Sequence, residues 1–335
     1  MKISYFFGQH RGGTYRYIKN LVGSIRELGI ETTFDAFPPA FLHGYIPPFS
    51  GNRLKKRRRD ADIFHCGSNS GFALKLQSKP LVVTTFHLVF SANYQKYTTF
   101  TQRIYYSLQR NYLKETLKIA DEIVAISKSV SWDLQRLFGV NNAKVIYPGI
   151  DTNLFRPRKI NNSPNTVELF FVGNLIKRKG VDLLPQIMER LGNKFRLFYI
   201  SPSDEMKFSQ TNMTSLDYLS KEALVEMYNR CDIFLFPSRL EGFGYGVAEA
   251  MSCQKPVVCT NCSSLPELIV NGKGGFLCEM DNVDDFVAKI KILAADKNLR
   301  EEMGKFNRER VLEKFTLKRM AKEYLKVYEQ LIKER

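Results

Sequence analysis

A glycine-rich turn within residues 237–251 constrains this chain more than any other feature of its sequence. The mainly apolar residues 232–236 come directly before it and are typical of a buried parallel strand. A helix that begins near Tyr245 would point unpaired N–H groups and the positive end of its dipole at the turn. Three glycines let the backbone approach a ligand closely; they are Gly242, Gly244 and Gly246. The stretch therefore suits a phosphate group.

Two glutamates flank this turn. Glu241 lies before it and Glu249 lies in the predicted helix, with seven residues between them. One carboxylate can reach a ligand at the turn, and the other can reach a group further along the helix. Two carboxylates that accept hydrogen bonds, with no cation among them, suit the hydroxyl groups of sugars. For this stretch by itself, the alternative is a strand–loop–helix corner in which the glycines serve only packing.

This spacing, with the Ala-Met at residues 250–251, resembles the donor-site signature of the family 4 glycosyltransferases, and the resemblance extends over most of the chain. It implies an α/β fold of GT-B type, in which two doubly wound parallel-sheet (Rossmann-like) domains face a cleft. It also implies a retaining transferase that needs no metal and moves a sugar from a nucleotide-diphosphate sugar to an acceptor.

Composition favours two globular domains in one chain. A chain of 335 residues is longer than a domain with a single hydrophobic core usually is, and 44% of the residues are hydrophobic. No run of 18 apolar residues occurs, and the apolar start is too short for a signal peptide, so we expect a soluble cytoplasmic protein. The six cysteines do not form a disulfide framework, and we expect reduced thiols.

Two short motifs have simpler structural explanations. Cys259 and Cys262 form a Cys-x-x-Cys, but zinc would need a second pair, and this pair closes a predicted strand. Asp60 and Asp62 have the Asp-x-Asp form of metal-dependent GT-A transferases, but they lead directly into a predicted buried strand at residues 63–66. We therefore predict no metal site.

Positive charge is concentrated in the first half of the chain. The net charge is +16; residues 1–156 carry 22 Lys and Arg against 10 Asp and Glu, whereas residues 157–335 carry 28 against 24. Six of the basic residues lie between Arg53 and Arg59. A polyanion, an anionic membrane face or a phosphorylated acceptor would fit this half.

The segment that begins at Asn93 and ends at Lys118 mixes aromatic and basic residues. Its members include Tyr94, Tyr97, Phe100, Tyr105, Tyr106 and Tyr112, with Lys96, Arg103, Arg110 and Lys114. Rings at headgroup depth and cations near anionic lipids would suit a membrane surface. The same mixture could bind single-stranded nucleic acid, or it could form a helix with part of its aromatic set in the core.

Strands and helices alternate along both halves, as in parallel doubly wound sheets. We predict strands at residues 2–7, 63–66, 81–85, 122–126, 143–147, 167–172, 195–200, 216–219, 232–236 and 256–260. We predict helices at residues 14–28, 181–191, 221–230, 281–295, 298–314 and 317–333, and one that Ser127 caps. The predicted domains are residues 1–155 for the acceptor, a polar linker at 156–165, and residues 166–315 for the nucleotide-sugar. In GT-B folds the final helix, here residues 316–335, crosses back to the first domain.

The resemblance also assigns residues outside the glycine-rich turn. Family 4 enzymes carry an arginine and a lysine on the donor diphosphate; Lys179 matches the lysine, whereas Asn174 stands where the arginine is usual. Lys177 or Arg178 could replace that missing charge. The family places the nucleobase near the end of a strand, around Tyr218 and Leu219.

In the first half, Gly12 and Gly13 close the first strand–helix turn, at the edge of the sheet where ligands bind in such folds. Gly13 lies at the turn that touches donor phosphate and acceptor in the family. His87 stands where the family has a histidine that faces the transferred sugar; a buried structural histidine is the alternative.

Cleavage of the sugar–phosphate bond leaves an oxocarbenium-like sugar and a diphosphate that gains charge, so positive potential fixed at the diphosphate helps most. The resemblance gives this task to Lys179, to Gly13 and to the backbone N–H groups of Phe243, Gly244 and Tyr245. Glu241 would hold sugar hydroxyls, Glu249 the ribose, and His87 would orient the transferred sugar.

A UDP-sugar is the expected donor because UDP is the commoner donor type in the family. The acceptor could be a lipid-linked or cell-surface glycan precursor, presented at an anionic membrane surface. A nucleotide-sugar-binding protein without turnover is the first alternative, because Asn174 removes a charge at the phosphate. A nucleic-acid-binding protein is the second, and it leaves the paired glutamates unexplained.

Overall fold

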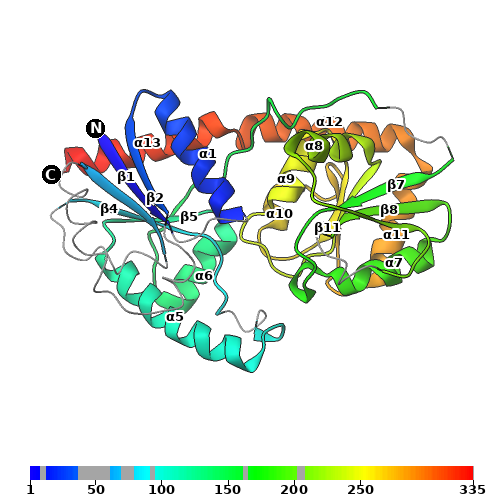
Figure 1. Ribbon diagram of the computed structural model, residues 1–335, viewed down its shortest axis with the longest axis horizontal. Helices are drawn as coiled ribbons and strands as arrows, with labels where there is room; N and C mark the ends of the chain where they lie inside the picture. The colour runs from blue at the N-terminus through cyan, green and yellow to red at the C-terminus, as the bar shows by residue number, and fades with distance from the viewer. Residues whose placement is uncertain are drawn as a thin grey trace. The chain divides into compact units, whose positions relative to one another are not determined.

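The computed structural model describes residues 1–7, 13–36, 61–68, 79–90, 95–160, 165–201 and 208–334. Gly12, Asp60 and Asn93, and the whole basic cluster at residues 53–59, lie outside the described residues. The chain divides into two compact units (Figure 1). Unit 1 comprises Met1–Gly149 and Leu317–Arg335, and unit 2 comprises Ile150–Thr316.

Unit 1 is built on a parallel sheet whose described strands lie in the order β2-β1-β3-β4-β5-β6. The strands are β1 (Lys2–Phe7), β2 (Glu31–Ala36), β3 (Ile63–Gly67), β4 (Leu81–Thr85), β5 (Glu122–Ala125) and β6 (Lys144–Val145). The helices are α1 (Gly13–Glu27), α5 (Phe100–Ile119), α6 (Lys128–Phe138) and α13 (Leu317–Lys333). The predicted strands at 2–7 and 81–85 are confirmed at both ends, and Ser127 caps α6 as predicted.

Unit 2 contains a second parallel sheet in the order β12-β11-β10-β7-β8-β9. Its strands are β7 (Val167–Phe171), β8 (Phe195–Ile200), β9 (Met213–Leu216), β10 (Ile233–Phe236), β11 (Val257–Thr260) and β12 (Gly275–Cys278). Its helices are α7 (Leu184–Leu191), α8 (Lys221–Arg230), α9 (Tyr245–Ser252), α10 (Leu265–Leu268), α11 (Val283–Ala295) and α12 (Lys297–Lys314). Two 3₁₀ turns, η2 (Lys177–Lys179) and η3 (Val181–Leu183), precede α7.

Several elements differ from the sequence prediction. The strand predicted at 216–219 is wrong, because β9 ends at Leu216 and Tyr218 lies beyond it. The helix predicted at 181–191 begins as a 3₁₀ turn and becomes α-helical at Leu184. The edge strands β2 and β12 were not predicted. β2 has the sequence ETTFDA and lacks the near-continuous apolar run that marks a central parallel strand, whereas β12 is apolar but only four residues long.

The chain passes between the units twice, and the two ends of unit 2, which are distant in sequence, pair with each other. The backbone N–H of Ile150 donates to Phe315 O at 2.7 Å. Residues that we assigned to the linker are already attached to unit 2: Asn229 Nδ2 donates to Arg156 O at 3.1 Å. The division between Gly149 and Ile150 therefore comes before the predicted linker at 156–165.

A chain of buried polar side chains attaches α13 to the sheet of unit 1. His65 Nδ1 lies 2.7 Å from Tyr328 Oη, and its Nε2 lies 2.7 Å from Thr84 Oγ1. Tyr324 Oη lies 2.8 Å from the same Thr84 hydroxyl and also hydrogen-bonds Tyr17 on α1. All these side chains are buried, and in Figure 1 α13 lies beside α1. Because each polar group has a partner, the network holds α13 without leaving a buried group unsatisfied.

In unit 2 the turn after β7 approaches the segment after β10 very closely. Gly180 has a left-handed backbone, with φ 68° and ψ 23°, and a Cβ there would lie 2.0 Å from Pro237 O. Backbone hydrogen bonds join the same segments, since Arg239 N–H donates to Arg178 O at 2.8 Å. Only glycine fits at position 180, for reasons of both conformation and space.

Among the described residues, no helix combines the length and the apolar character that crossing a bilayer requires.

The buried imidazole of His65 makes the stability of unit 1 depend on pH. Burial lowers the pKa of His65 from 6.5 to about 3. Between these values the unfolded chain binds a proton that the native protein does not, so stability falls as pH falls below 6.5. At pH 5 the free energy of unfolding is about 2 kcal/mol lower than at pH 7.

Scanning calorimetry of the wild type and of His65→Gln should show that the substitution removes this part of the decrease in stability. His87→Gln, at an exposed histidine, should retain it; equal pH dependence in all three proteins would contradict the assignment.

Gly180→Ala should destabilise the protein more than Gly139→Ala does. Gly139 has nearly the same backbone conformation, with φ 71° and ψ 18°, but a Cβ added there would meet no atom within 4 Å. Both substitutions incur about 1–2 kcal/mol of left-handed strain. Gly180→Ala adds the clash with Pro237 O, and overpacking costs roughly a further 1–3 kcal/mol. Similar melting temperatures for the two variants would show that the close approach is not required.

Candidate functional site

The candidate site lies where β7 and β10 end. These strands are parallel neighbours, with Leu169 opposite Ile233 and Phe170 opposite Phe234. Their carboxyl ends therefore meet at one edge of the sheet, which is where ligands bind in open α/β folds. The segments that follow, 172–180 after β7 and 237–244 after β10, carry most of the residues that we predicted for the donor.

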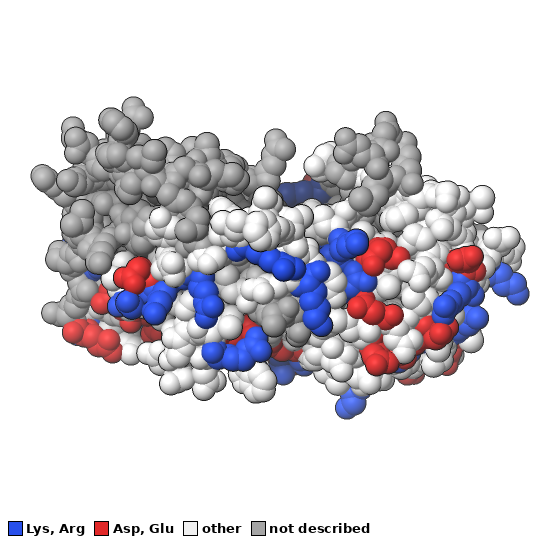
Figure 2. Space-filling model, turned by 90° about the horizontal axis from the view of Figure 1, so that it is seen from below, with Lys and Arg blue, Asp and Glu red and all other residues white. Residues whose placement is uncertain are grey.

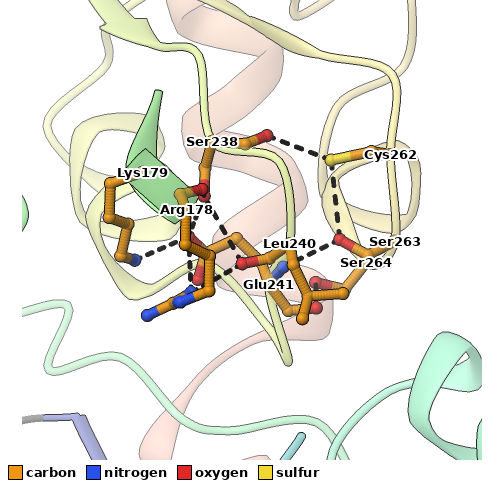
Figure 3. A network of polar contacts seen from close by, with 8 residues as sticks. All are labelled: Arg178, Lys179, Ser238, Leu240, Glu241, Cys262, Ser263 and Ser264. Atoms are coloured by element: carbon orange, nitrogen blue, oxygen red, sulfur yellow. Dashed lines mark hydrogen bonds and ion pairs between the residues drawn. The ribbon is translucent and has the colours of Figure 1, made fainter. Parts of the chain in front are cut away.

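Lys179 and Glu241 form an ion pair at this edge (Figure 3). Lys179 Nζ lies 2.6 Å from Glu241 Oε1, and the side chains are 14% and 9% exposed. Ser238 Oγ donates to the same carboxylate oxygen at 2.6 Å. Although burial opposes ionisation, the charges of Lys179 and Arg178 lower the pKa of Glu241 below its usual value. The carboxylate is therefore ionised at neutral pH.

Arg178 takes part in the same network. Its Nη1 donates to Leu240 O at 2.7 Å and lies 3.9 Å from Glu241 Oε1. Lys179 Nζ also lies 5.1 Å from the centre of the Phe236 ring, within the range of a cation–π contact. Two cations therefore face one carboxylate, and the group keeps one net positive charge at the edge of the sheet. Such a charge suits an anionic ligand.

Residues after β11 hold the backbone of Glu241. Its N–H donates to Ser263 Oγ at 2.9 Å, and Ser264 Oγ donates to its carbonyl oxygen at 3.1 Å. Cys262 Sγ donates to Ser238 O at 3.1 Å (Figure 3). Three adjacent strands thus supply the segments that fix this carboxylate, and sequence reasoning missed Ser263 and Ser264 because their partners are 22 and 23 residues away.

Cys259 and Cys262 are both buried free thiols, and burial raises their pKa. Such thiols are poor nucleophiles and poor metal ligands. Within the described ranges, no group of three His, Cys, Asp or Glu side chains is placed to hold a metal ion.

The glycine-rich turn leads into α9 as predicted. Gly244 is the N-cap with φ 101°, a left-handed conformation that glycine adopts without strain. The first bond inside the helix runs from Ala248 N–H to Gly244 O at 3.1 Å, so the preceding N–H groups have no acceptor within the helix. Phe243 is buried and packs against Tyr245 and Phe315. The turn and the N-terminus of α9 therefore form the strand–turn–helix arrangement that the sequence predicts here.

Glu249 is more enclosed than we expected. Its side chain is buried, and its Oε2 accepts a hydrogen bond from Tyr228 Oη at 2.8 Å. Tyr228 lies on α8 and is itself buried. Sequence reasoning missed Tyr228 because nothing in its local sequence indicates a partner 21 residues away.

The remaining predicted residues are more exposed. Asn174 is exposed, Tyr218 is 78% exposed, and Leu219 is partly exposed after β9. In unit 1, Gly13 begins α1 and is exposed, and His87 is exposed two residues after β4. The alternative of a buried structural histidine is wrong for His87; of the two histidines that the structure describes, His65 is buried and His87 is exposed.

Comparison with known proteins gives the chain a family. Residues 11–154 match the family description Glycosyltransferase Family 4, and residues 154–310 match that of Glycosyl transferases group 1. An uncharacterized glycosyltransferase of Methanocaldococcus jannaschii is 28% identical over 228 residues, which are 66% of this chain and 63% of that protein. The matched segment thus spans less than two thirds of this relative.

Two further proteins extend the comparison. The N,N'-diacetylbacillosaminyl-diphospho-undecaprenol alpha-1,3-N-acetylgalactosaminyltransferase of Campylobacter jejuni is 26% identical over 226 residues, 65% of this chain and 57% of that one. The structure of Anabaena HepE in complex with UDP and glucose has a TM-score of 0.79 at 14% identity, and covers 98% of this chain and 100% of its own.

The two family matches together cover residues 11–310, and the two parallel sheets have the architecture of the solved GT-B enzymes. The chain therefore belongs to the family 4 glycosyltransferases and has the GT-B fold.

Proposed function

We propose that this glycosyltransferase transfers a hexose with retention from a UDP-sugar, without a metal ion, to a lipid-linked glycan precursor. The observation that carries the proposal is the Lys179–Glu241 pair, which stands at the carboxyl ends of β7 and β10 beside the N-terminus of α9. The HepE complex with UDP supports the choice of nucleotide, and the Campylobacter relative acts on a diphospho-undecaprenol acceptor by its name.

In this proposal the leaving diphosphate lies against Lys179 and the donors of residues 243–245. The bond between the anomeric carbon and the phosphate oxygen breaks, and the diphosphate keeps the electron pair. A fixed cation and backbone dipoles stabilise that developing charge more than they stabilise the bound donor. The acceptor hydroxyl attacks from the same face and passes its proton to the departing phosphate oxygen, so no enzyme base is needed.

Other residues bind the remaining parts of the donor. Glu241 accepts hydrogen bonds from hydroxyls of the transferred sugar, and its ionised state suits this task. Glu249 binds the hydroxyl groups of the ribose. For this, the Glu249 carboxylate must accept hydrogen bonds from the ribose in addition to, or in place of, the one from Tyr228. Tyr218 and Leu219 lie near the base.

Attachment to an anionic membrane surface would bring lipid-linked acceptors to unit 1 at the cytoplasmic face. The second half of α5 packs into unit 1 through Leu113 and Leu117, both buried. At its first turn, by contrast, Phe100 and Ile104 are 76% and 52% exposed, with the exposed Arg103 between them. Figure 2 shows the molecule from below, the side on which α5 lies in Figure 1. Lys and Arg side chains are scattered over this face among uncharged surface and Asp and Glu side chains. Exposed apolar and basic side chains on one turn suit an interfacial helix.

A nucleotide-sugar-binding protein without turnover is the second candidate. Asn174 supplies no charge at the position where the family has arginine, and Arg178 is partly engaged with Leu240 O. A single lysine would then carry the phosphate charge. Release of UDP from a labelled UDP-sugar, with or without a lipid-linked acceptor, separates an enzyme from a binding protein.

Lys179→Ala should reduce turnover of the preferred UDP-sugar by roughly 100-fold, because one preorganised charge on a leaving group is worth about 3 kcal/mol. Initial rates of UDP release at saturating donor provide the measurement. Lys194→Ala, at an exposed lysine elsewhere in unit 2, serves as the control and should keep the wild-type rate. Turnover within threefold of the wild type would remove Lys179 from this role.

The membrane hypothesis predicts binding to vesicles that contain anionic lipid and release at high salt, since screening shortens the range of the charges. Replacing both Phe100 and Ile104 with Ser should weaken co-sedimentation several-fold, because the helix loses its apolar contacts with the bilayer. The matched control replaces Ile292 and Leu312, which are 49% and 48% exposed on α11 and α12 of unit 2. Equal binding to neutral and anionic vesicles, or none at low salt, would overturn the hypothesis.

A further inference from the structure

Arg239 is a buried arginine whose guanidinium hydrogen-bonds several other parts of unit 2. Its side chain is 5% exposed, although it lies between the exposed loops that surround the site. Nη1 and Nη2 donate to the two carboxylate oxygens of Asp182 at 2.6 and 2.9 Å, and Nε donates to Asp281 Oδ1 at 2.6 Å. Nη1 also hydrogen-bonds the carbonyl oxygen of Lys177. This fork geometry fixes the relative positions of its partners in a way that a lysine could not.

The partners of Arg239 lie on both sides of Lys179. The carbonyl of Lys177 comes two residues before Lys179, and the carboxylate of Asp182 comes three residues after it. Between them, Arg178 O accepts the backbone N–H of Arg239 at 2.8 Å. Arg239 thus holds both ends of the turn 177–182 and a point between them. The same arginine stands two residues before Glu241, the ion-pair partner of Lys179.

The cluster is ionised under ordinary conditions. A buried guanidinium requires close anions, and Arg239 has two. Although partial burial works against ionisation, the hydrogen bonds from Arg239 lower the pKa of Asp182 below its usual value. Asp182 and Asp281 are 41% and 47% exposed, so either can be changed without opening the core of the unit.

We infer that Arg239 is a positioning residue for Lys179: by clamping the turn 177–182 it keeps the Lys179 ammonium at the carboxyl ends of β7 and β10, where the donor diphosphate binds. Arg239 itself touches no substrate. This inference rests on the proposed role of Lys179. A flexible lysine side chain retains its charge wherever it points, but it contributes to diphosphate binding only while its backbone and stem are held in place.

A double-mutant cycle tests the inference through binding, without any acceptor. Titration calorimetry first measures UDP, GDP and ADP against the intact chain, and the tightest of the three becomes the probe. The probe is then titrated into Lys179→Ala, Arg239→Lys and the double variant. Lys179→Ala should weaken binding at least about tenfold, because a charge-assisted contact to phosphate is lost. Arg239→Lys should weaken it several-fold in the wild-type background and by less than about 1.5-fold when Lys179 is already absent, since coupled residues are not additive.

Two further variants separate positioning from a general loss of stability. Asp182→Asn should reproduce the effect of Arg239→Lys in smaller measure, because the turn loses one anchor. Arg230→Lys is the matched control: Arg230 also forms a bidentate pair, with Glu168 at 2.8 Å for both bonds, but at the opposite ends of the strands. It should leave binding of the probe unchanged. Melting temperatures of all variants show whether each protein is folded at the temperature of the titration.

The outcomes distinguish the two proposals. If none of the three nucleotides binds, or if Lys179→Ala binds as the wild type does, the proposed function of Lys179 fails and this inference fails with it. A second outcome is that Lys179→Ala weakens binding of the probe, whereas the folded variants Arg239→Lys and Asp182→Asn bind the probe as tightly as the wild type does. In that case only the positioning role of Arg239 is overturned. An equal loss from Arg239→Lys in both backgrounds would likewise show that Arg239 acts on stability or on the ligand directly.

Discussion

The parallel pairing of β7 with β10 is the constraint on which the candidate site depends. Residues 172–180 and 237–244 are about as far apart in sequence as a whole small domain, yet they leave the sheet at the same edge. Parallel strands impose this, because their carboxyl ends cannot lie at opposite edges. Lys179 and Glu241 meet only for this reason, and the residues that hold them come from the same segments or from the next strand, β11.

The two units use buried polar groups differently. In unit 1, a neutral histidine, a threonine and tyrosines form a hydrogen-bonded chain that attaches a helix from the end of the sequence. In unit 2, the network at the candidate site is ionic: Glu241 pairs with Lys179, and the buried Arg239 pairs with two partly exposed aspartates. A neutral network costs little to bury when every member has a partner, whereas buried ions need close counter-charges. The neutral network serves the fold of unit 1. In unit 2 one ionic network stands at the candidate site, and a further ionic pair, Arg230 with Glu168, stands at the opposite ends of the strands.

Much of the fold follows from local sequence. Strands such as 2–7 and 195–200 are mainly apolar and largely buried, and parallel strands that are covered on both faces favour such segments. Ser127 caps α6 where the sequence predicts it, because a cap is formed with a backbone N–H three residues away. The edge strands β2 and β12 were missed, and the strand before Tyr218 was placed too late, because only pairing with a neighbour decides these segments.

The sequence by itself determined the class of protein, the glycine-rich turn, its two glutamates and Lys179, since these are properties of residue type and spacing. Tertiary structure alone decided which groups contact one another. It paired Lys179 with Glu241, enclosed Glu249 with Tyr228, and placed Arg239 across the turn that carries Lys179. Each of these contacts joins residues separated by 21 positions or more, and no local periodicity or propensity reports on such distances. The contacts of Lys179 and Arg239 exist because a parallel sheet gathers the ends of its strands at one edge, whereas Tyr228 and Glu249 meet because helices α8 and α9 pack together.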